Sequence, residues 1–319
     1  MIRRWLPALI LFACGTAAGG EPLEIVVISD LNGPYGQIGL NPRVRVAVAR
    51  IIESKPDLVI STGDMVAGQQ PYPKLDDQAL HNMWTEFHRT VTEPLAAAGI
   101  PFAATPGNHD ASAYPGYARE RAAYARAWND RRPAVEMIDD TNFPFRYAFR
   151  FGEAVFVSLD ATRMGAMPAD DMAWLTGILT SPAAADRPAV LFGHLPVWPF
   201  AHGRETEYLD DPALRDLLAR GKVRLMLSGH HHAYYAGRHG QTVHISQACL
   251  GSGPRRLIGA HAVSPRAYTR FTLGADGRIE SDAMLAPGFT ERLDLTTLPP
   301  FIDAPFGRLE RLDLAGADR

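Results

Sequence analysis

The feature that most constrains the fold is a series of short apolar runs, each of which ends in polar residues. Five such runs lie at residues 25–28, 58–60, 101–104, 189–192 and 223–227. Continuous apolar strands of this kind belong inside a sheet that is buried on both faces. Helical patterns lie between them at residues 43–54, 78–98, 116–128, 169–179 and 212–220. This alternation predicts an α/β fold whose ligand-binding residues gather at the carboxyl ends of the strands.

The pattern changes after about residue 145, where strands follow one another directly. Residues 145–151 and 153–159 are predicted to pair across a tight turn at Gly152. Further strands are expected at residues 241–247, 267–273 and 278–285. We therefore expect two β-sheets packed face to face with helices outside, a two-sheet sandwich with four layers in the order α/β/β/α.

Composition limits the classes of partner. The chain has 319 residues, of which 46% are hydrophobic, so it can bury a substantial core. Its formal net charge is −3, so no basic field is available to bind a nucleic-acid duplex or an anionic membrane surface. An anionic substrate must therefore be attracted by charges in a local site.

The first twenty residues have the pattern of a secretory signal peptide. Arg3 and Arg4 precede an apolar stretch at residues 6–13, and small residues follow at 16–20. This predicts a periplasmic or secreted bacterial protein. A lipoprotein is the alternative, with membrane anchoring only if Cys14 carries a lipid. No later apolar run is long enough to span a bilayer.

Five predicted strand ends carry polar side chains that suit metal ions. They supply carboxylates, amides and imidazoles, the mixture of oxygen and nitrogen donors that a pair of divalent cations needs. The carboxylate of Asp64 could bridge two ions that are completed by side chains from other loops. The clusters are Asp30 with Asn32, Asp64, Asn108 with His109, His194, and His230 with His232.

These clusters, in this order, resemble the motifs of the calcineurin-like metallophosphoesterase family. The resemblance covers residues 24 to 285, and although Gly-Asp alone is common, the combination is highly specific. The matching strings are Asp30-Leu31-Asn32, Gly63-Asp64, Gly107-Asn108-His109-Asp110, Gly193-His194 and Gly229-His230-His231-His232.

The resemblance implies two metal sites that share Asp64. The first would be held by Asp30, Asn32, Asp64 and His232, and the second by Asp64, Asn108, His194 and His230. The expected cofactors are two divalent ions, Mn²⁺ foremost, with Mg²⁺, Fe²⁺ and Zn²⁺ as alternatives. His109 would contact the phosphoryl oxygen or protonate the leaving group.

Asn32 departs from the family pattern, which usually has histidine at this position. An amide oxygen is a neutral, harder and weaker ligand than an imidazole nitrogen, so the first site should favour Mn²⁺ or Mg²⁺ over zinc. Asp30, Asp64 and His232 would still hold the ion.

Other residues near the motifs have open roles. Asp110 joins His109 in the predicted catalytic pair, either by capping a helix or by ordering His109. Arg255 and Arg256 follow a flexible Gly-Ser-Gly-Pro segment and, with Asn108, are the candidate substrate contacts. His231 should point away from the ions.

The sequence thus predicts a leader at 1–20, a metallophosphoesterase domain at 21–287, and a surface extension at 288–319. The expected activity is hydrolysis of a small phosphomonoester or phosphodiester of the nucleotide, sugar-phosphate or lipid head-group type. A metal-bridging hydroxide would attack phosphorus in line. The alternative is a metal-binding pseudo-phosphatase that recognises a phosphorylated ligand without turnover. The sequence does not specify the oligomeric state.

Overall fold

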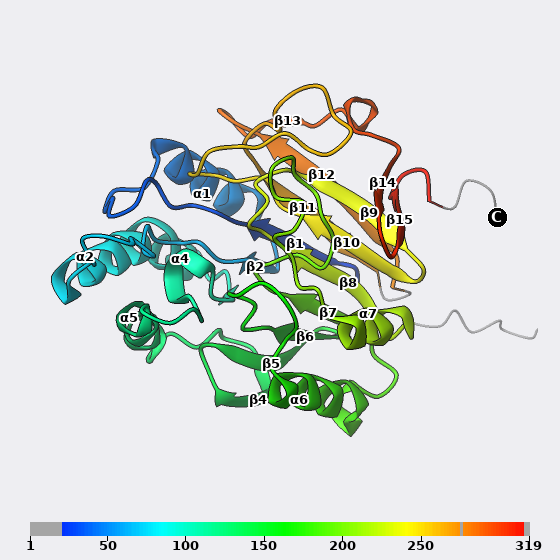
Figure 1. Cartoon of the computed structure of the whole chain (residues 1–319), viewed down its shortest axis with the longest axis horizontal. Coiled ribbons are helices and arrows are strands. Elements are labelled where there is room, and N and C mark those ends of the chain that lie inside the picture. Colours follow the sequence, from blue (N-terminus) through cyan, green and yellow to red (C-terminus); the bar gives the residue numbers. More distant parts are fainter. Residues whose placement is uncertain (1–20, 275–276, 316–319) are drawn as a thin grey trace, which may run out of the picture.

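The computed structural model of the chain describes residues 21–274 and 277–315. Two mixed β-sheets face each other, and helices cover their outer sides (Figure 1). The predicted four-layer sandwich is therefore confirmed. The predicted leader, including Cys14, lies outside the described residues and stays a prediction.

The first sheet has six strands in the order β13-β12-β11-β1-β2-β3. Because β1, β2 and β3 are parallel, their carboxyl ends lie at one edge. The bounds are β1 (Leu23–Ile28), β2 (Leu58–Ser61), β3 (Phe102–Ala104), β11 (Ala267–Leu273), β12 (Ile279–Leu285) and β13 (Glu291–Arg292).

The second sheet has nine strands in the order β14-β15-β9-β10-β8-β7-β6-β5-β4. Its parallel strands β6, β7, β8 and β10 again end at one edge. The bounds are β4 (Glu136–Asn142), β5 (Arg146–Phe151), β6 (Ala154–Ser158), β7 (Ala189–Phe192), β8 (Val223–Ser228), β9 (Tyr235–His239), β10 (Thr242–Ser246), β14 (Phe301–Ala304) and β15 (Gly307–Arg311).

Helices cover the outer faces of both sheets (Figure 1). Those packed on the first sheet are α1 (Pro42–Ser54), α2 (Asp77–Phe87), η1 (His88–Thr92), α3 (Glu93–Ala97), α4 (Asn108–Ala111) and α5 (Ala118–Trp128). Those on the second are α6 (Ala169–Thr180), η2 (Pro182–Ala184) and α7 (Pro212–Ala219), while η3 (Leu295–Thr297) lies in the C-terminal segment. The predicted helix at 78–98 is a continuous run of α2, η1 and α3, with a π-helical turn in the middle.

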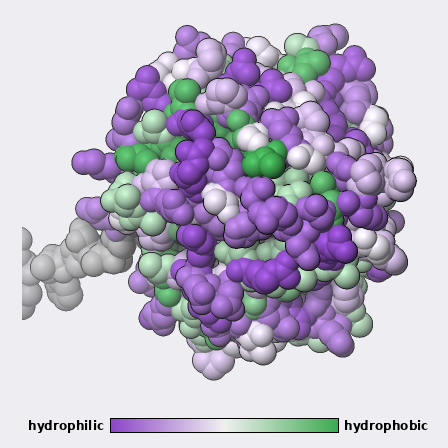
Figure 2. All heavy atoms as spheres, turned by 90° about the vertical axis from the view of Figure 1, so that its left-hand side faces the viewer, coloured by the Kyte–Doolittle hydropathy of each residue, from purple (hydrophilic) through white to green (hydrophobic). Residues whose placement is uncertain are grey.

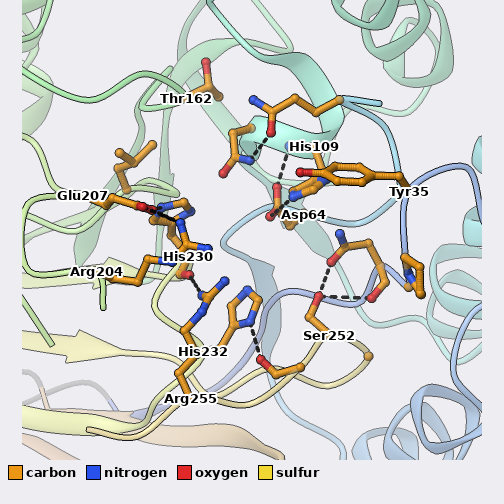
Figure 3. Close-up of a pocket in the computed structure, with 18 of the residues that line it drawn as sticks. Tyr35, Asp64, His109, Thr162, Arg204, Glu207, His230, His232, Ser252 and Arg255 are labelled. Carbon is orange, nitrogen blue, oxygen red and sulfur yellow. Dashed lines mark hydrogen bonds and ion pairs between the residues drawn. The ribbon is translucent and has the colours of Figure 1, made fainter. Parts of the chain in front are cut away.

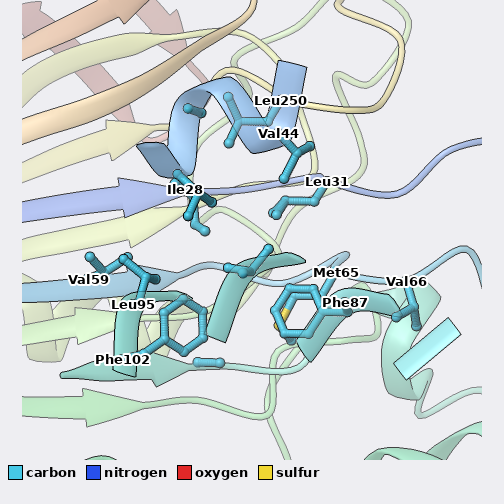
Figure 4. Close-up of a cluster of buried hydrophobic side chains, with 14 of the residues drawn as sticks. Ile28, Leu31, Val44, Val59, Met65, Val66, Phe87, Leu95, Phe102 and Leu250 are labelled. Carbon is cyan, nitrogen blue, oxygen red and sulfur yellow. The ribbon is translucent and has the colours of Figure 1, made fainter. Parts of the chain in front are cut away.

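The core explains why residues 25–28 of the leading strand, β1, are all apolar. Val26 and Ile28 of β1 pack against the helices, whereas Ile25 and Val27 pack against the second sheet. Figure 4 shows the helix side of this arrangement, where Ile28 lies near Val44 of α1. Both faces of β1 are thus buried, and only its end is free to carry polar side chains.

The segment after Pro287 adds strands to both sheets. β13 pairs with β12 in the first sheet, and the hairpin β14–β15 pairs with β9 in the second.

The face that carries α1, α2 and α5 is largely hydrophilic, with apolar side chains in small separate groups (Figure 2). Among the described residues, no helix combines the length and apolarity that crossing a membrane requires.

Candidate metal centre

The carboxyl ends of the parallel strands meet at a cavity of about 760 Å³. Figure 3 shows that loops from both sheets supply its side chains. Asp30 and His194 are fully buried and contact its lining residues His232 and Asn108, respectively. The structure therefore brings the predicted metal ligands together; those that line the cavity are Asn32, Asp64, Asn108, His230 and His232.

Asp30 and His232 form one half of the centre. The Oδ2 atom of Asp30 accepts hydrogen bonds from Ser29 Oγ at 2.6 Å and from the His230 main-chain nitrogen at 3.2 Å. Its Oδ1 atom lies 2.9 Å from His232 Nε2, yet it receives no hydrogen bond from any residue that the structure describes. One buried carboxylate oxygen is thus left facing an imidazole nitrogen.

Asp64 lies between the two halves. Its Oδ1 atom accepts the main-chain N–H of His109 at 2.8 Å, and its Oδ2 atom lies 3.3 Å from His194 Nε2. The same His194 nitrogen lies 2.9 Å from Asn108 Oδ1. This is the central position that a bridging carboxylate needs.

Three histidines are oriented by main-chain carbonyl groups. His109 Nδ1 lies 2.9 Å from the carbonyl oxygen of Gly68. His194 Nδ1 lies 2.8 Å from that of Thr62, and His232 Nδ1 lies 2.7 Å from that of Gly253. Since a carbonyl oxygen can only accept, each Nδ1 carries a proton, and Nε2 has a lone pair for a metal when the ring is neutral. Metal-binding histidines are usually oriented in this way. Without metal, the effect of burial is outweighed by Asp64, which raises the pKa of His194 to about 9, so its Nε2 is protonated as well and faces Asp64 and Asn108.

His230 is held differently, by a residue that the sequence analysis missed. Its Nε2 atom lies 2.8 Å from Oε2 of Glu207, and the hydrogen bond from His230 lowers the pKa of Glu207 to about 2. Burial lowers the pKa of His230 itself to about 4, so the ring is neutral near pH 7. The carboxylate therefore accepts Nε2–H and leaves Nδ1 with the lone pair. His231 points away from the centre, as predicted, and its Nε2 atom donates to the main-chain oxygen of Glu207 at 2.9 Å.

The backbone is unusual at the ligand positions. Asp30, Asp64, His230 and His232 all have positive φ angles, between 51° and 62°. Left-handed backbone at a residue other than glycine occurs mostly where the surrounding structure enforces it, often at functional sites. At these four positions the left-handed conformation turns the chain sharply just after a strand ends.

Gly107 shows how closely the loops approach. A Cβ atom at this position would lie 2.1 Å from the Asp64 main-chain nitrogen and 2.2 Å from its Oδ1 atom. Only glycine fits there, which explains the glycine before Asn108 in the motif.

These residues fit two divalent cations. The donor atoms of Asp30, Asp64 and His232 all lie within 4.8 Å of one another. Donors that share one ion at about 2.0–2.2 Å must themselves be roughly 3 Å apart, and the separations from His232 to Asp30 and from His194 to Asn108 are both 2.9 Å. The oxygen of Asp30 that receives no hydrogen bond would be satisfied by such an ion.

The carboxylates of Asp30 and Asp64 are kept ionised by neighbouring histidines. Burial alone would raise the pKa of Asp64, but His194 and His109 outweigh it and hold the pKa well below its usual range. In Asp30, burial is likewise outweighed by His232, so its pKa is lowered. Both carboxylates are therefore ionised near neutral pH, as metal ligands must be.

Asn32 is placed at the rim of the centre with its side chain engaged. Its Oδ1 atom accepts a hydrogen bond from Ser252 Oγ, which also donates to the Asn32 main-chain oxygen at 3.1 Å. Ser252 is a second residue that sequence reasoning missed, because it lies on a loop more than two hundred residues away.

Asp110 lies behind the centre rather than in the cavity. Its Oδ1 atom accepts the main-chain N–H groups of Met65 and Val66 at 2.8 and 2.9 Å, and its Oδ2 atom accepts that of Gly107 at 2.9 Å. Burial and the charge of Asp64 raise the pKa of Asp110 to about 7. Of the two sequence-based roles, the structure favours that of a cap that fixes the loops around Asp64 and His109.

Only one of the two candidate arginines lines the cavity. Arg255 lines the cavity and donates from Nη1 to the His230 main-chain oxygen at 2.5 Å. Arg256 is exposed and does not line the cavity, so its predicted substrate contact is not supported by its position. Two arginines that were not predicted, Arg204 and Arg266, line it instead.

One wall of the cavity is aromatic. The ring of Tyr35 stacks on His109 with centroids 5.2 Å apart, and about half of Tyr35 is exposed, at 53%. Tyr234 and Tyr235, which follow the last ligand, are instead buried in the core.

Comparisons with known proteins agree with this geometry. A family model described as calcineurin-like phosphoesterase matches residues 23–234. A dimetal phosphatase from Danio rerio is 17% identical and has a TM-score of 0.52, with 84% of this chain and 100% of that chain covered. The Thermus thermophilus protein TT1561 is 14% identical with a TM-score of 0.47, covering 82% and 98% of the two chains. At these identities the structural likeness concerns the fold alone. No curated protein matches the chain in sequence.

Proposed function

The chain belongs to the calcineurin-like phosphoesterase family and is a metal-dependent phosphoester hydrolase, and we propose that it acts on a small phosphomonoester or phosphodiester in the cavity at the strand ends. One observation carries this proposal. The Asp30 oxygen that receives no hydrogen bond faces His232 beside the central Asp64, in an arrangement that supports binding of a divalent cation there.

The residues divide into two sets of ligands. Asp30, Asp64 and His232, with Asn32 at the rim, would hold one ion. Asp64, Asn108, His194 and His230 would hold the other. When bound, the two ions supply positive charge to the phosphoryl group and make a water molecule more acidic.

His109 is placed to serve the leaving group. Its Nδ1–H group is held by the Gly68 carbonyl oxygen, so its Nε2 atom faces the cavity, 3.9 Å from Asp64 Oδ2. A ring protonated at Nε2 can donate that proton to the leaving oxygen of the ester. Tyr35 stacks on the ring and Asp64 accepts its main-chain N–H, so the imidazole is oriented before substrate arrives.

Metal preference and location are part of the same proposal. The amide of Asn32 supports Mn²⁺ or Mg²⁺ in the first site, with Fe²⁺ and Zn²⁺ as alternatives. The signal-like pattern at residues 1–20 supports export to the periplasm or medium, where nucleotides, sugar phosphates and phospholipid head groups are available substrates.

The test combines metal analysis with hydrolysis of two simple esters. The purified chain is loaded with Mn²⁺, Mg²⁺, Fe²⁺ or Zn²⁺ in turn, and bound metal is counted by mass spectrometry. Hydrolysis of p-nitrophenyl phosphate and bis-p-nitrophenyl phosphate then distinguishes monoester from diester preference. Two ions per chain with turnover are expected; no turnover with any of these ions would overturn the proposal.

A non-catalytic binding protein is the second candidate. It is favoured by one observation, the hydrogen bond that Asn32 Oδ1 accepts from Ser252, because this bond competes with the first ion. The metal count separates the two candidates, since this alternative predicts one ion per chain and phosphate binding without hydrolysis.

A further inference from the structure

Arg255 and Arg266 lie on the same loop segment, next to the metal centre, and both line its cavity. Each is anchored through one nitrogen to a main-chain carbonyl oxygen. Arg255 Nη1 donates to His230 at 2.5 Å, and Arg266 Nη2 donates to Ser252 at 2.8 Å. The two guanidinium groups are therefore anchored at the cavity wall rather than extended into solvent.

Neither guanidinium forms an ion pair with a carboxylate of the described part of the chain. Within residues 21–274 and 277–315, no carboxylate lies within 4.0 Å of the side-chain nitrogens of Arg255 or Arg266. The Nε atom of Arg266 is buried and has no hydrogen-bond partner. Burial and the positive charge of Arg204 lower the pKa of Arg255 by more than the charges of Asp30 and Glu207 raise it. Such half-buried, unpaired charge is unfavourable unless a ligand compensates it.

Arg204 provides a contrast within the same cavity. Both oxygens of Glu207 accept hydrogen bonds from its Nη1 atom, so its charge is compensated. Asp64, the other acidic residue of the cavity wall, would be a ligand of the metal ions. After these pairings, the excess positive charge of the wall comes from Arg255 and Arg266.

We propose that Arg255 and Arg266 form a second anion subsite, so that the substrate is a small phosphoester carrying a further anionic group beyond the one that is hydrolysed. This inference rests on the proposed function of the metal centre. A guanidinium group anchored through one nitrogen keeps its other N–H donors in a planar fork that suits a carboxylate or phosphoryl oxygen pair. The loop that carries them is itself braced, because His202 N donates to Arg256 O at 2.9 Å and Ile258 N to Phe200 O at 2.7 Å.

A matched pair of monoesters tests the subsite. 2-Phosphoglycerate and glycerol 2-phosphate differ only in that a carboxylate replaces a hydroxymethyl group. In the Mn²⁺-loaded protein, kcat/KM for the carboxylate compound should exceed that for glycerol 2-phosphate by roughly 10- to 100-fold, the effect of one charge-assisted contact. The pair fructose 1,6-bisphosphate and fructose 6-phosphate repeats the comparison with a second phosphoryl group.

Variants assign the preference to the two arginines. In Arg255→Gln and Arg266→Gln the ratio should fall toward one, whereas Arg256→Gln, which alters the exposed neighbour, should keep the ratio of the unchanged chain. Metal content is measured in each variant to show that the centre is intact. A ratio near one in the unchanged chain, or a ratio that both Gln variants retain, would overturn the subsite.

Calorimetric binding separates this inference from the proposed function. If no ester is hydrolysed, tighter binding of 2-phosphoglycerate than of glycerol 2-phosphate, lost in Arg266→Gln, would support the subsite while the hydrolase proposal fails. Turnover without any preference for the anionic compounds would support the hydrolase proposal and overturn the subsite.

Discussion

The Nε2 atom of His230 lies 2.8 Å from Oε2 of Glu207, so a carboxylate from the loop between β7 and α7 orients a predicted metal ligand on the loop after β8. A carboxylate that accepts the distal N–H of a histidine fixes its tautomer and increases its basicity toward a metal. Glu207 is thus expected to act through His230 rather than on the ion itself.

Removing this carboxylate should weaken the second site. In Glu207→Ala, the affinity for the second ion is expected to fall by about 10- to 100-fold, measured as bound metal during titration of the metal-free protein. Glu207→Gln keeps an acceptor oxygen and should lose less. The control is Glu205→Ala, two residues away and exposed. Unchanged metal binding in Glu207→Ala would show that Glu207 serves only Arg204.

Asp64→Ala should abolish the binding of both ions. Asp64 is central, with His194 Nε2 at 3.3 Å and the His109 main-chain nitrogen at 2.8 Å, and no other carboxylate occupies that place among the described residues. Mass spectrometry should find less than one ion per chain, and turnover should be lost. Retention of one tightly bound ion would contradict the bridging role.

His109→Ala should separate chemistry from metal binding. The ring lines the cavity but is not among the predicted ligands, so both ions should stay bound while kcat falls by about 10²–10⁴-fold. Steady-state kinetics and metal analysis on the same sample check this. Loss of metal equal to that in Asp64→Ala would mean that the division between ligand and acid is wrong.

Asn32→His should shift metal preference toward zinc. An imidazole nitrogen is a softer donor than the amide oxygen, and the change also removes the hydrogen bond to Ser252. Competition between Zn²⁺ and Mn²⁺ measures the shift. Ser252→Ala is the partner variant: it frees the Asn32 oxygen and should strengthen Mn²⁺ binding. If neither change alters metal binding, Asn32 is a turn residue only.

His244 should make stability dependent on pH, independently of the metal centre. Burial and the nearby His239 lower its pKa to about 3. Below about pH 6.5 the unfolded chain binds a proton at this position that the folded chain does not, so stability falls as pH decreases. Between pH 7 and pH 5 the loss is about 2 kcal/mol.

His244→Phe should remove that part of the pH dependence. Urea unfolding of the variant and the unchanged chain at both pH values gives the difference between their slopes. Equal slopes would show that His244 is not responsible.

The sequence predicted the layers, and the edge at which the candidate ligands meet, for a physical reason. Each ligand directly follows a strand that is buried on both faces, so local pattern and chain order were sufficient for Asp30, Asp64 and His194. Strand β4 was not predicted because it is an edge strand with the largely polar sequence EMIDDTN, which lacks the apolar run of a buried strand.

The residues that surround the ligands could not be predicted in the same way. Glu207, Ser252 and Arg266 lie on loops with no regular pattern, and they reach the cavity only because two loops are hydrogen-bonded to each other. Arg255 and Arg256 are adjacent in sequence and chemically identical, so only the direction of the backbone distinguishes them.

The left-handed backbone at the ligand positions has a consequence for how such a gene would change over time. Each such residue raises the folded chain's free energy by on the order of 1 kcal/mol, so four together are appreciable against a typical net stability of about 5–15 kcal/mol. Glycine adopts this conformation without strain. A duplicated copy released from selection for hydrolysis could therefore gain folding stability by drifting to glycine at Asp30, Asp64, His230 and His232. The strain at these four turns is thus the cost of placing carboxylate and imidazole side chains where glycine would fit without strain.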